Sequence, residues 1–288
     1  MQKKRAKAKP VAAANSPGRV KKKEKFPKAL RMPFGTATLV LTFSIAIMYF
    51  ALSNGAAYPT VRMITAGSLS AENLPFGAVT YLFDHAGLGH LIENLAGLVI
   101  FCLVVEAALS YRDALAIFFL SGVVGGLACL AAEPQVKIIG ASAGIVGLAV
   151  AGVLSDPKRG VLALAFVALL VNFAAPAAAD WASSESYKSL EQQKELAQQK
   201  AQELLAQQKP AEAQQQVLVA QEKQGLIEQQ ARTKKSEDAA GPAEAAHLVG
   251  AIVGAAYVIA FRREVVFSWM KKANANLARI QRGKKNGN

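Results

Sequence analysis

The chain has 288 residues, of which 52% are hydrophobic, and its formal net charge is +13. Its apolar residues occur in long runs almost free of charge, which excludes an ordinary soluble domain, because a soluble helix buries only one face. A helix of about 20 mostly apolar residues can cross the roughly 30 Å hydrocarbon core of a bilayer. The composition therefore predicts an all-α, polytopic membrane protein.

Six segments meet this length requirement and predict a six-helix transmembrane bundle. They are residues 34–53, 86–108, 114–132, 138–155, 160–179 and 245–261. The resulting organisation is a basic, disordered tail (1–33), spans one to five (34–179), an insertion (180–243), span six (244–262) and a second basic tail (263–288). A soluble bundle of unusually apolar helices is the alternative, and the length of the runs disfavours it.

The placement of charge predicts the orientation of these spans. Residues 1–33 hold twelve Lys or Arg and one acid, and the segment from Arg262 onward holds eight and one acid. Basic flanks mark the cytoplasmic side, so we expect both termini in the cytoplasm, in the plasma membrane of a bacterium or archaeon. The basic start lacks the short apolar run of a signal peptide. The tails are expected to contact the lipid bilayer through anionic headgroups, and no nucleic acid partner is expected.

The insertion, residues 180–243, is rich in Gln, Glu, Lys and Ala and lies on the predicted extracytoplasmic side. Positions that step by four and three form a weak coiled-coil seam on each side of Pro210. They are Leu190, Lys194, Ala197, Ala201, Leu204 and Gln208, then Ala213, Val217, Ala220, Gln224, Ile227 and Ala231. Because proline cannot continue a helix, a helical hairpin is one interpretation, and a mobile polar loop is the other.

A glycine-rich motif, GASAG at 140–144, opens the fourth predicted span. Its serine, Ser142, would have the free amides of a helix N-terminus beside it. His247 begins the sixth span and precedes a G-x-x-x-G pair, Gly250 and Gly254. Such small residues let helices approach closely, here against Gly144 and Gly147, and would bring the imidazole within reach of the hydroxyl. Serine and a neutral histidine are a nucleophile and a base.

A second polar pair, His90 and Asn94, is four residues apart and so projects from one face of a helix. Both side chains are hydrogen-bond donors, and ionisable groups inside spans tend to be functional. His90, Ser142 and His247 all fall near the predicted outer ends of their spans. Independent packing residues need not share one depth, so we interpret them as one site for hydrolysis of an amide bond. His85 is interpreted as an interfacial, structural histidine.

These motifs together resemble the rhomboid family of intramembrane serine proteases. The resemblance covers residues 79–161 and 244–262. It rests on VTYLFDH (79–85), HLIEN (90–94), Glu106, GASAG (140–144), and AHLVG (246–250) followed by Gly254. It implies that Ser142 is the nucleophile and His247 the general base of a dyad without aspartate, and that His90, Asn94 and the Ser142 amide bind the oxyanion. Gly140, Gly144, Gly250, Gly254 and Glu106 would be structural.

The resemblance also implies substrates that are single-span or multi-span membrane proteins, cleaved through an acyl-enzyme with neither metal nor cofactor. Ala143 stands where the family often has Gly. The insertion, residues 180–243, stands where the family has a short loop, and the insertion is a candidate docking arm for a partner. A catalytically silent rhomboid-like binder of client helices is the alternative function, although such a protein would be expected to have lost Ser142 or His247. A small transporter is another, but its polar residues should extend through the full depth of the spans.

Overall fold

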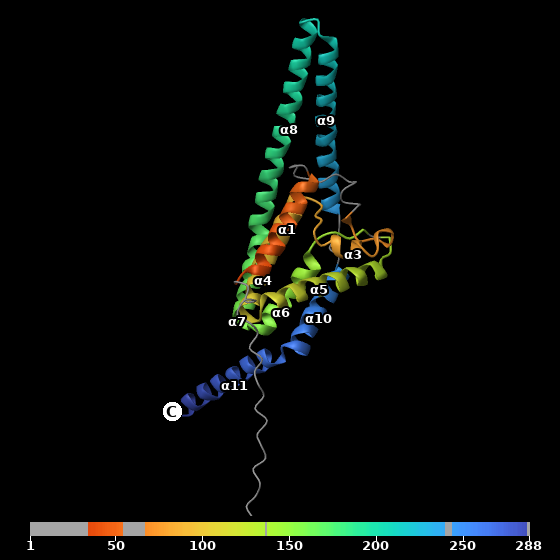
Figure 1. Ribbon diagram of the computed structural model, residues 1–288. Coiled ribbons are helices and arrows are strands. Elements are labelled where there is room, and N and C mark those ends of the chain that lie inside the picture. The colour runs from red at the N-terminus through yellow and green to blue at the C-terminus, as the bar shows by residue number, and fades with distance from the viewer. Residues whose placement is uncertain (1–33, 54–66, 136, 240–243, 287–288) are drawn as a thin grey trace, which may run out of the picture. The chain divides into compact units, whose positions relative to one another are not determined.

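The computed structural model describes residues 34–53, 67–135, 137–239 and 244–286. Pro33–Asn288 forms one compact unit, and the tail 1–33 lies outside the described residues. Nearly all regular structure in the described ranges is helical (Figure 1). In chain order the elements are α1 (Thr36–Ser53), η2 (Ala71–Asn73), α3 (Gly77–Thr80), α4 (Leu88–Ala108), α5 (Tyr111–Ala132), α6 (Ser142–Ser155), α7 (Pro157–Leu169), η3 (Leu170–Ala174), α8 (Ala175–Ala206), α9 (Pro210–Ala239), α10 (Glu244–Phe261) and α11 (Arg263–Asn286).

Four of the helical segments are long and apolar enough to cross a membrane: Leu88–Ala108, Tyr111–Ala132, Pro157–Ala206 and Glu244–Phe261. The apolar helices Thr36–Ala51 and Ser142–Ser155 are shorter. Of the predicted fourth span, 138–155, only residues 142–155 are helical. Its first residues are extended, since Ile138 pairs with Leu69 in an isolated β-bridge and the helix begins only at Ser142.

The predicted end of the fifth span, residue 179, is not the end of a helix. The helix continues without a break from Pro157 to Ala206, through a π-helical turn at Leu170–Ala174. In that turn Asn172 donates its side-chain amide to the carbonyl of Ala168 at 2.7 Å, so the polar group is satisfied within its own helix. The membrane helix and the first arm of the insertion are consequently one continuous rod.

The insertion forms two long helices, α8 and α9, that lie side by side (Figure 1). The chain reverses at Gln207–Lys209, where Gln208 takes a positive φ of 59°. Buried small residues let the arms approach, and the buried members of the seam are Leu190, Ala197, Ala201, Ala213, Ala220 and Ile227. In α9 the seam includes Gln230 and not the predicted Ala231, which is exposed. The Gln230 amide reaches Ser186 on the other arm at 2.9 Å, a contact that alanine cannot make.

Glu106, near the end of α4, binds the start of α1. Its carboxylate accepts hydrogen bonds from the backbone N–H of Gly35 at 2.8 Å and of Thr38 at 2.7 Å, and from the Thr38 hydroxyl at 2.9 Å. A helix N-terminus has free amides and a positive end. The buried carboxylate thus has the partners that a structural role requires, and it joins α1 to the bundle.

Candidate active site

The predicted site residues come from the N-terminal turns of three helices. Ser142 is the first residue of α6, His90 is the third of α4 and His247 is the fourth of α10. The first N–H groups of a helix lack intrahelical acceptors, and its start carries about half a positive charge. The N-termini of α4, α6 and α10 therefore favour negative charge at the site around Ser142 without any Lys or Arg side chain.

Ser142 and His247 are in direct contact. The Nε2 atom of His247 lies 2.7 Å from the Oγ atom of Ser142, although the residues are 105 positions apart. Both residues are partly buried in the bundle. This separation lies within the range a base needs to remove a hydroxyl proton.

Close helix contacts hold these two residues together. A Cβ atom added at Gly250 would collide with the carbonyl oxygen of Ala143, and one at Gly254 would collide with that of Gly147. The backbones of α10 and α6 therefore touch, as the G-x-x-x-G pattern predicts. The prediction that Gly144 would meet α10 was wrong, because Gly144 faces Phe118 of α5. Residues four apart share a helix face, so Gly147 faces α10 with Ala143, and Gly144 turns toward α5.

The segment before Ser142 is shaped by Gly140. Its φ of +109° is one that residues with a side chain rarely adopt. A Cβ atom there would also overlap the imidazole of His90, so that ring lies directly against the backbone two residues before Ser142. The Gly140 N–H donates to the carbonyl of Tyr81 at 2.8 Å. Gly140 thus has a conformational role as well as the predicted packing role.

Asn94 lies one helical turn after His90 and is buried. Its side-chain amide donates to the His90 carbonyl at 2.8 Å, within its own helix. One of its two N–H donors is thus used within the helix, and the expected role of this amide toward an oxyanion stays a prediction. Its Oδ1 atom has no hydrogen-bond partner in the described part of the chain. No hydrogen bond to this oxygen therefore holds the orientation of the amide group.

His85, predicted to be an interfacial, structural histidine, is buried, with 2% of its surface exposed. Its ring meets the His90 ring edge-on, with 5.1 Å between centroids. Close contact between the two rings supports the position of His90. Sequence spacing gave no sign of this contact, since residues five apart do not share one helix face, and His85 precedes the start of α4.

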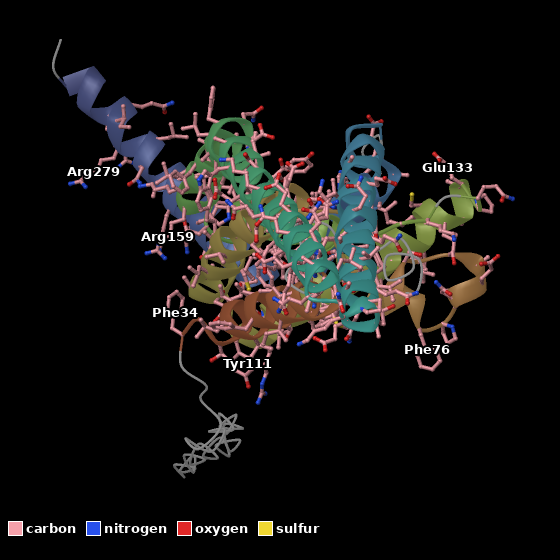
Figure 2. The ribbon with its side chains drawn as sticks, turned by 90° about the horizontal axis from the view of Figure 1, so that it is seen from above. Phe34, Phe76, Tyr111, Glu133, Arg159 and Arg279 are labelled. Atoms are coloured by element: carbon pink, nitrogen blue, oxygen red, sulfur yellow. The ribbon has the colours of Figure 1, made fainter. Side chains whose placement is uncertain are left out.

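The segment before α4, residues 67–87, supplies further supports that sequence reasoning missed. Leu69 and Ile138 exchange backbone hydrogen bonds of 2.8 and 3.1 Å, which ties this segment to the residues leading to Ser142. The hydroxyl of Tyr81 donates to the Gly122 carbonyl of α5 at 2.6 Å. Phe76, by contrast, is 80% exposed and projects from the edge of the segment (Figure 2). Backbone pairing of this kind leaves no sequence motif.

Asp84 is an unusual buried acid in the same segment. Only 4% of its surface is exposed, and its Oδ2 atom has no hydrogen-bond partner among the described residues. Burial raises the pKa of Asp84 to about 6 from its ordinary value of 3.8, because a charged carboxylate is costly away from water. The carboxyl lies against the backbone of Gly67, where no Cβ atom would fit.

The described residues contain no group of three or more His, Cys, Asp or Glu that could hold a metal ion. The site is instead a serine hydroxyl hydrogen-bonded to an imidazole, among helix N-termini, in a bundle with several membrane-length helices. These features define an integral membrane protein with the side chains that nucleophilic attack on a carbonyl requires.

The family model of the Rhomboid domain matches residues 74–184. The match covers less than half of the chain and supports membership of the rhomboid family, as the motifs predicted. It includes His90, Asn94 and Ser142 and ends in the first turns of α8, so His247 is joined to these residues by the geometry alone. Neither the curated proteins nor the solved structures searched gave a match to this chain.

Proposed function

We propose that the protein is an intramembrane serine endopeptidase that hydrolyses a peptide bond in or near a transmembrane helix of a membrane-protein substrate. The observation that carries the proposal is the 2.7 Å contact between Ser142 Oγ and His247 Nε2. Activation of the hydroxyl needs a base at this distance, and the same imidazole, once protonated, is the acid that protonates the leaving amine.

In the first step, Ser142 Oγ attacks the scissile carbonyl carbon while its proton passes to Nε2 of a neutral His247. The carbonyl oxygen becomes negatively charged. The Ser142 backbone N–H, free at the start of α6, is a donor for that oxyanion. The His90 side chain is a second candidate, because its ring lies against Gly140. The second N–H of the Asn94 amide is a third candidate.

In the second step, the imidazolium of His247 gives its proton to the leaving nitrogen, and the C–N bond breaks. An acyl ester on Ser142 remains. Water then loses a proton to His247 and attacks this ester. The ester C–O bond breaks, the imidazolium returns its proton to Ser142 Oγ, and the second product leaves. Every proton in the cycle passes through the one imidazole, so a dyad is sufficient for both halves.

The proposed topology has six spans with both termini in the cytoplasm. It counts α1 and α6 as spans despite their length, since the extended residues before Ser142 continue the fourth crossing. Ser142 then begins its helix within the membrane, while α8 and α9 lie on the extracytoplasmic side. Basic Lys158 and Arg159 at the start of α7 fit the cytoplasmic side.

The test is cleavage of a single-span model substrate by the full chain in vesicles, with Ser142→Ala and His247→Ala. Both variants are expected to lose at least 10³-fold in rate, in line with removal of a triad member. Ser155→Ala is the matched control, because Ser155 is a buried serine at the other end of α6. Retained cleavage in either dyad variant would refute the mechanism.

A fluorophosphonate probe separates the protease from a silent binder. The protease is expected to label at Ser142, and Ser142→Ala is expected to abolish the label. A chain that folds, retains client helices on purification and never reacts with the probe would be a binder instead.

A further inference from the structure

We propose that α11 is an interfacial membrane helix that binds the surface of an anionic bilayer through one apolar and one basic side. The helix has 24 residues and follows α10 after a single residue, Arg262. It therefore begins where a membrane-length helix ends. This proposal is independent of the chemistry at Ser142.

The start of α11 is fixed at the level where other helices end. Arg262 pairs with Asp113, in the first turn of α5, at 2.9 Å. Two turns further on, the indole N–H of Trp269 donates to the carbonyl of Leu154, in the last turn of α6, at 2.8 Å. The ends of α5, α6 and α10 thus lie together, and α11 leaves from that plane (Figure 1).

Beyond Trp269 the apolar side of α11 has no cover within the described part of the chain. Met270, Leu277 and Ile280 are 44%, 57% and 58% exposed. Their spacing, together with Val266, Trp269 and Ala273, repeats every three or four residues and forms one stripe. In water such a stripe would be a liability, whereas at the boundary between headgroups and acyl chains it is buried.

The opposite side of α11 is basic. Its exposed cations are Lys271, Lys272, Arg279 and Arg282. Figure 2 shows the Arg279 side chain projecting clear of the helix bundle. Residues 262–288 contain eight Lys or Arg and one acid, Glu264. Cations at this depth are attracted to anionic headgroups, and this charge complementarity selects a lipid surface as the occupant.

The test uses the full chain with one added cysteine, spin-labelled and placed in vesicles of phosphatidylcholine alone or with phosphatidylglycerol. Leu277→Cys reports the apolar stripe, and Ala275→Cys is its matched control, about 200° around the helix. The native Cys102 and Cys129 are buried, and the chain without an added cysteine measures background labelling.

At position 277 we expect oxygen, which dissolves in lipid, to relax the label severalfold more than a water-soluble nickel chelate. The preference should reverse at 275 and should strengthen when phosphatidylglycerol is present. Replacing Lys271, Lys272, Arg279 and Arg282 with Gln should remove the dependence on lipid charge. Ile280→Cys reports the same stripe if Leu277→Cys fails to fold.

Two results would overturn the proposal. Equal access of the nickel chelate at 275 and 277 would mean that the helix is free in water. Shielding of 277 from both relaxants, with spin–spin broadening that grows with protein density, would mean that a second copy of the chain covers the stripe.

Discussion

Asp113 and Arg262, 149 positions apart, form an ion pair of 2.9 Å that joins the start of α5 to the end of α10. The Asp113 carboxylate is almost fully buried, and it also accepts a hydrogen bond of 2.8 Å from the Tyr257 hydroxyl. This cluster and the Ser142–His247 contact lie at opposite ends of α10. The helix that carries the proposed base is therefore fixed at both ends.

Arg262→Gln is expected to destabilise the protein by about 1–3 kcal/mol, because it leaves a buried carboxylate with fewer partners. The Arg262 side chain is 45% exposed, so the loss should fall below that of a fully buried pair. The double variant Asp113→Asn/Arg262→Gln should recover part of it. A double-mutant cycle of unfolding midpoints in detergent measures the coupling, and strictly additive effects would show that the pair contributes nothing.

Gly250→Val should separate α10 from α6 and remove cleavage, since its side chain meets the Ala143 carbonyl. Overpacking of this kind costs about 1–3 kcal/mol, and a shift of about 1 Å at the dyad can cost 10²-fold in rate. The matched control is Gly225→Ala in α9, where a Cβ atom meets nothing within 4 Å. The control should stabilise its helix by roughly 0.5–1 kcal/mol and leave cleavage unchanged. A Gly250→Val enzyme as active as the control would contradict the close-contact account.

Asp84→Asn should stabilise the protein above pH 6 and have little effect below pH 4. The native state raises the pKa of Asp84 from 3.8 to about 6, so it binds the proton more tightly than the unfolded chain does. The protonated acid contributes fully to the free energy of unfolding below pH 3.8, and this contribution is lost as the pH rises through 6. The free energy of unfolding changes by up to about 3 kcal/mol over this range. Unfolding midpoints of both proteins between pH 4 and pH 8 test this sign. If the difference in unfolding midpoint between variant and parent is the same at pH 4 and at pH 8, ionisation of Asp84 does not contribute to the pH dependence of stability.

Deletion of residues 183–238, bridged by a short linker, tests the hairpin. The described contacts of α8 and α9 with each other are extensive, and no described hydrogen bond joins the hairpin to Ser142 or His247. We expect cleavage of a substrate that lacks an extramembrane domain to change by less than about tenfold, equivalent to 1.4 kcal/mol. Faster cleavage of every substrate would make the hairpin a gate, and loss of one substrate alone would make it a docking arm.

The sequence predicted the helical class and the Ser142–His247 contact because both depend on patterns along the chain. Apolar run length indicated the membrane helices, and the G-x-x-x-G pair at Gly250 indicated a close crossing. Which residues of α6 face α10 at this crossing was predicted less accurately. Whether Gly144 or Gly147 faces α10 depends on the rotation of α6 about its axis, which is set by Phe118 of α5.

Helix boundaries and side-chain partners were less accessible to prediction. The start of α6 depends on the backbone pairing of Ile138 with Leu69, a contact between distant residues with no shared motif. The continuity of α7 with α8 was obscured by the change from apolar to polar composition near residue 180, since a helix can cross that change without a break. Asn94 could be placed on the His90 face, but its choice of the His90 carbonyl as acceptor is a local competition that spacing does not reveal.

The convergence of three helix starts at Ser142, His90 and His247 bears on how the proposed enzyme should respond to its surroundings. Peptide dipoles carry no proton and do not titrate, so the field that favours an oxyanion there is the same in acid and in base. Salt should screen it poorly, because the groups are partly enclosed by the bundle. The pH dependence of the rate should then come from the imidazoles of the site, with His247 as the base and His90 as a candidate oxyanion donor, and not from the helix dipoles.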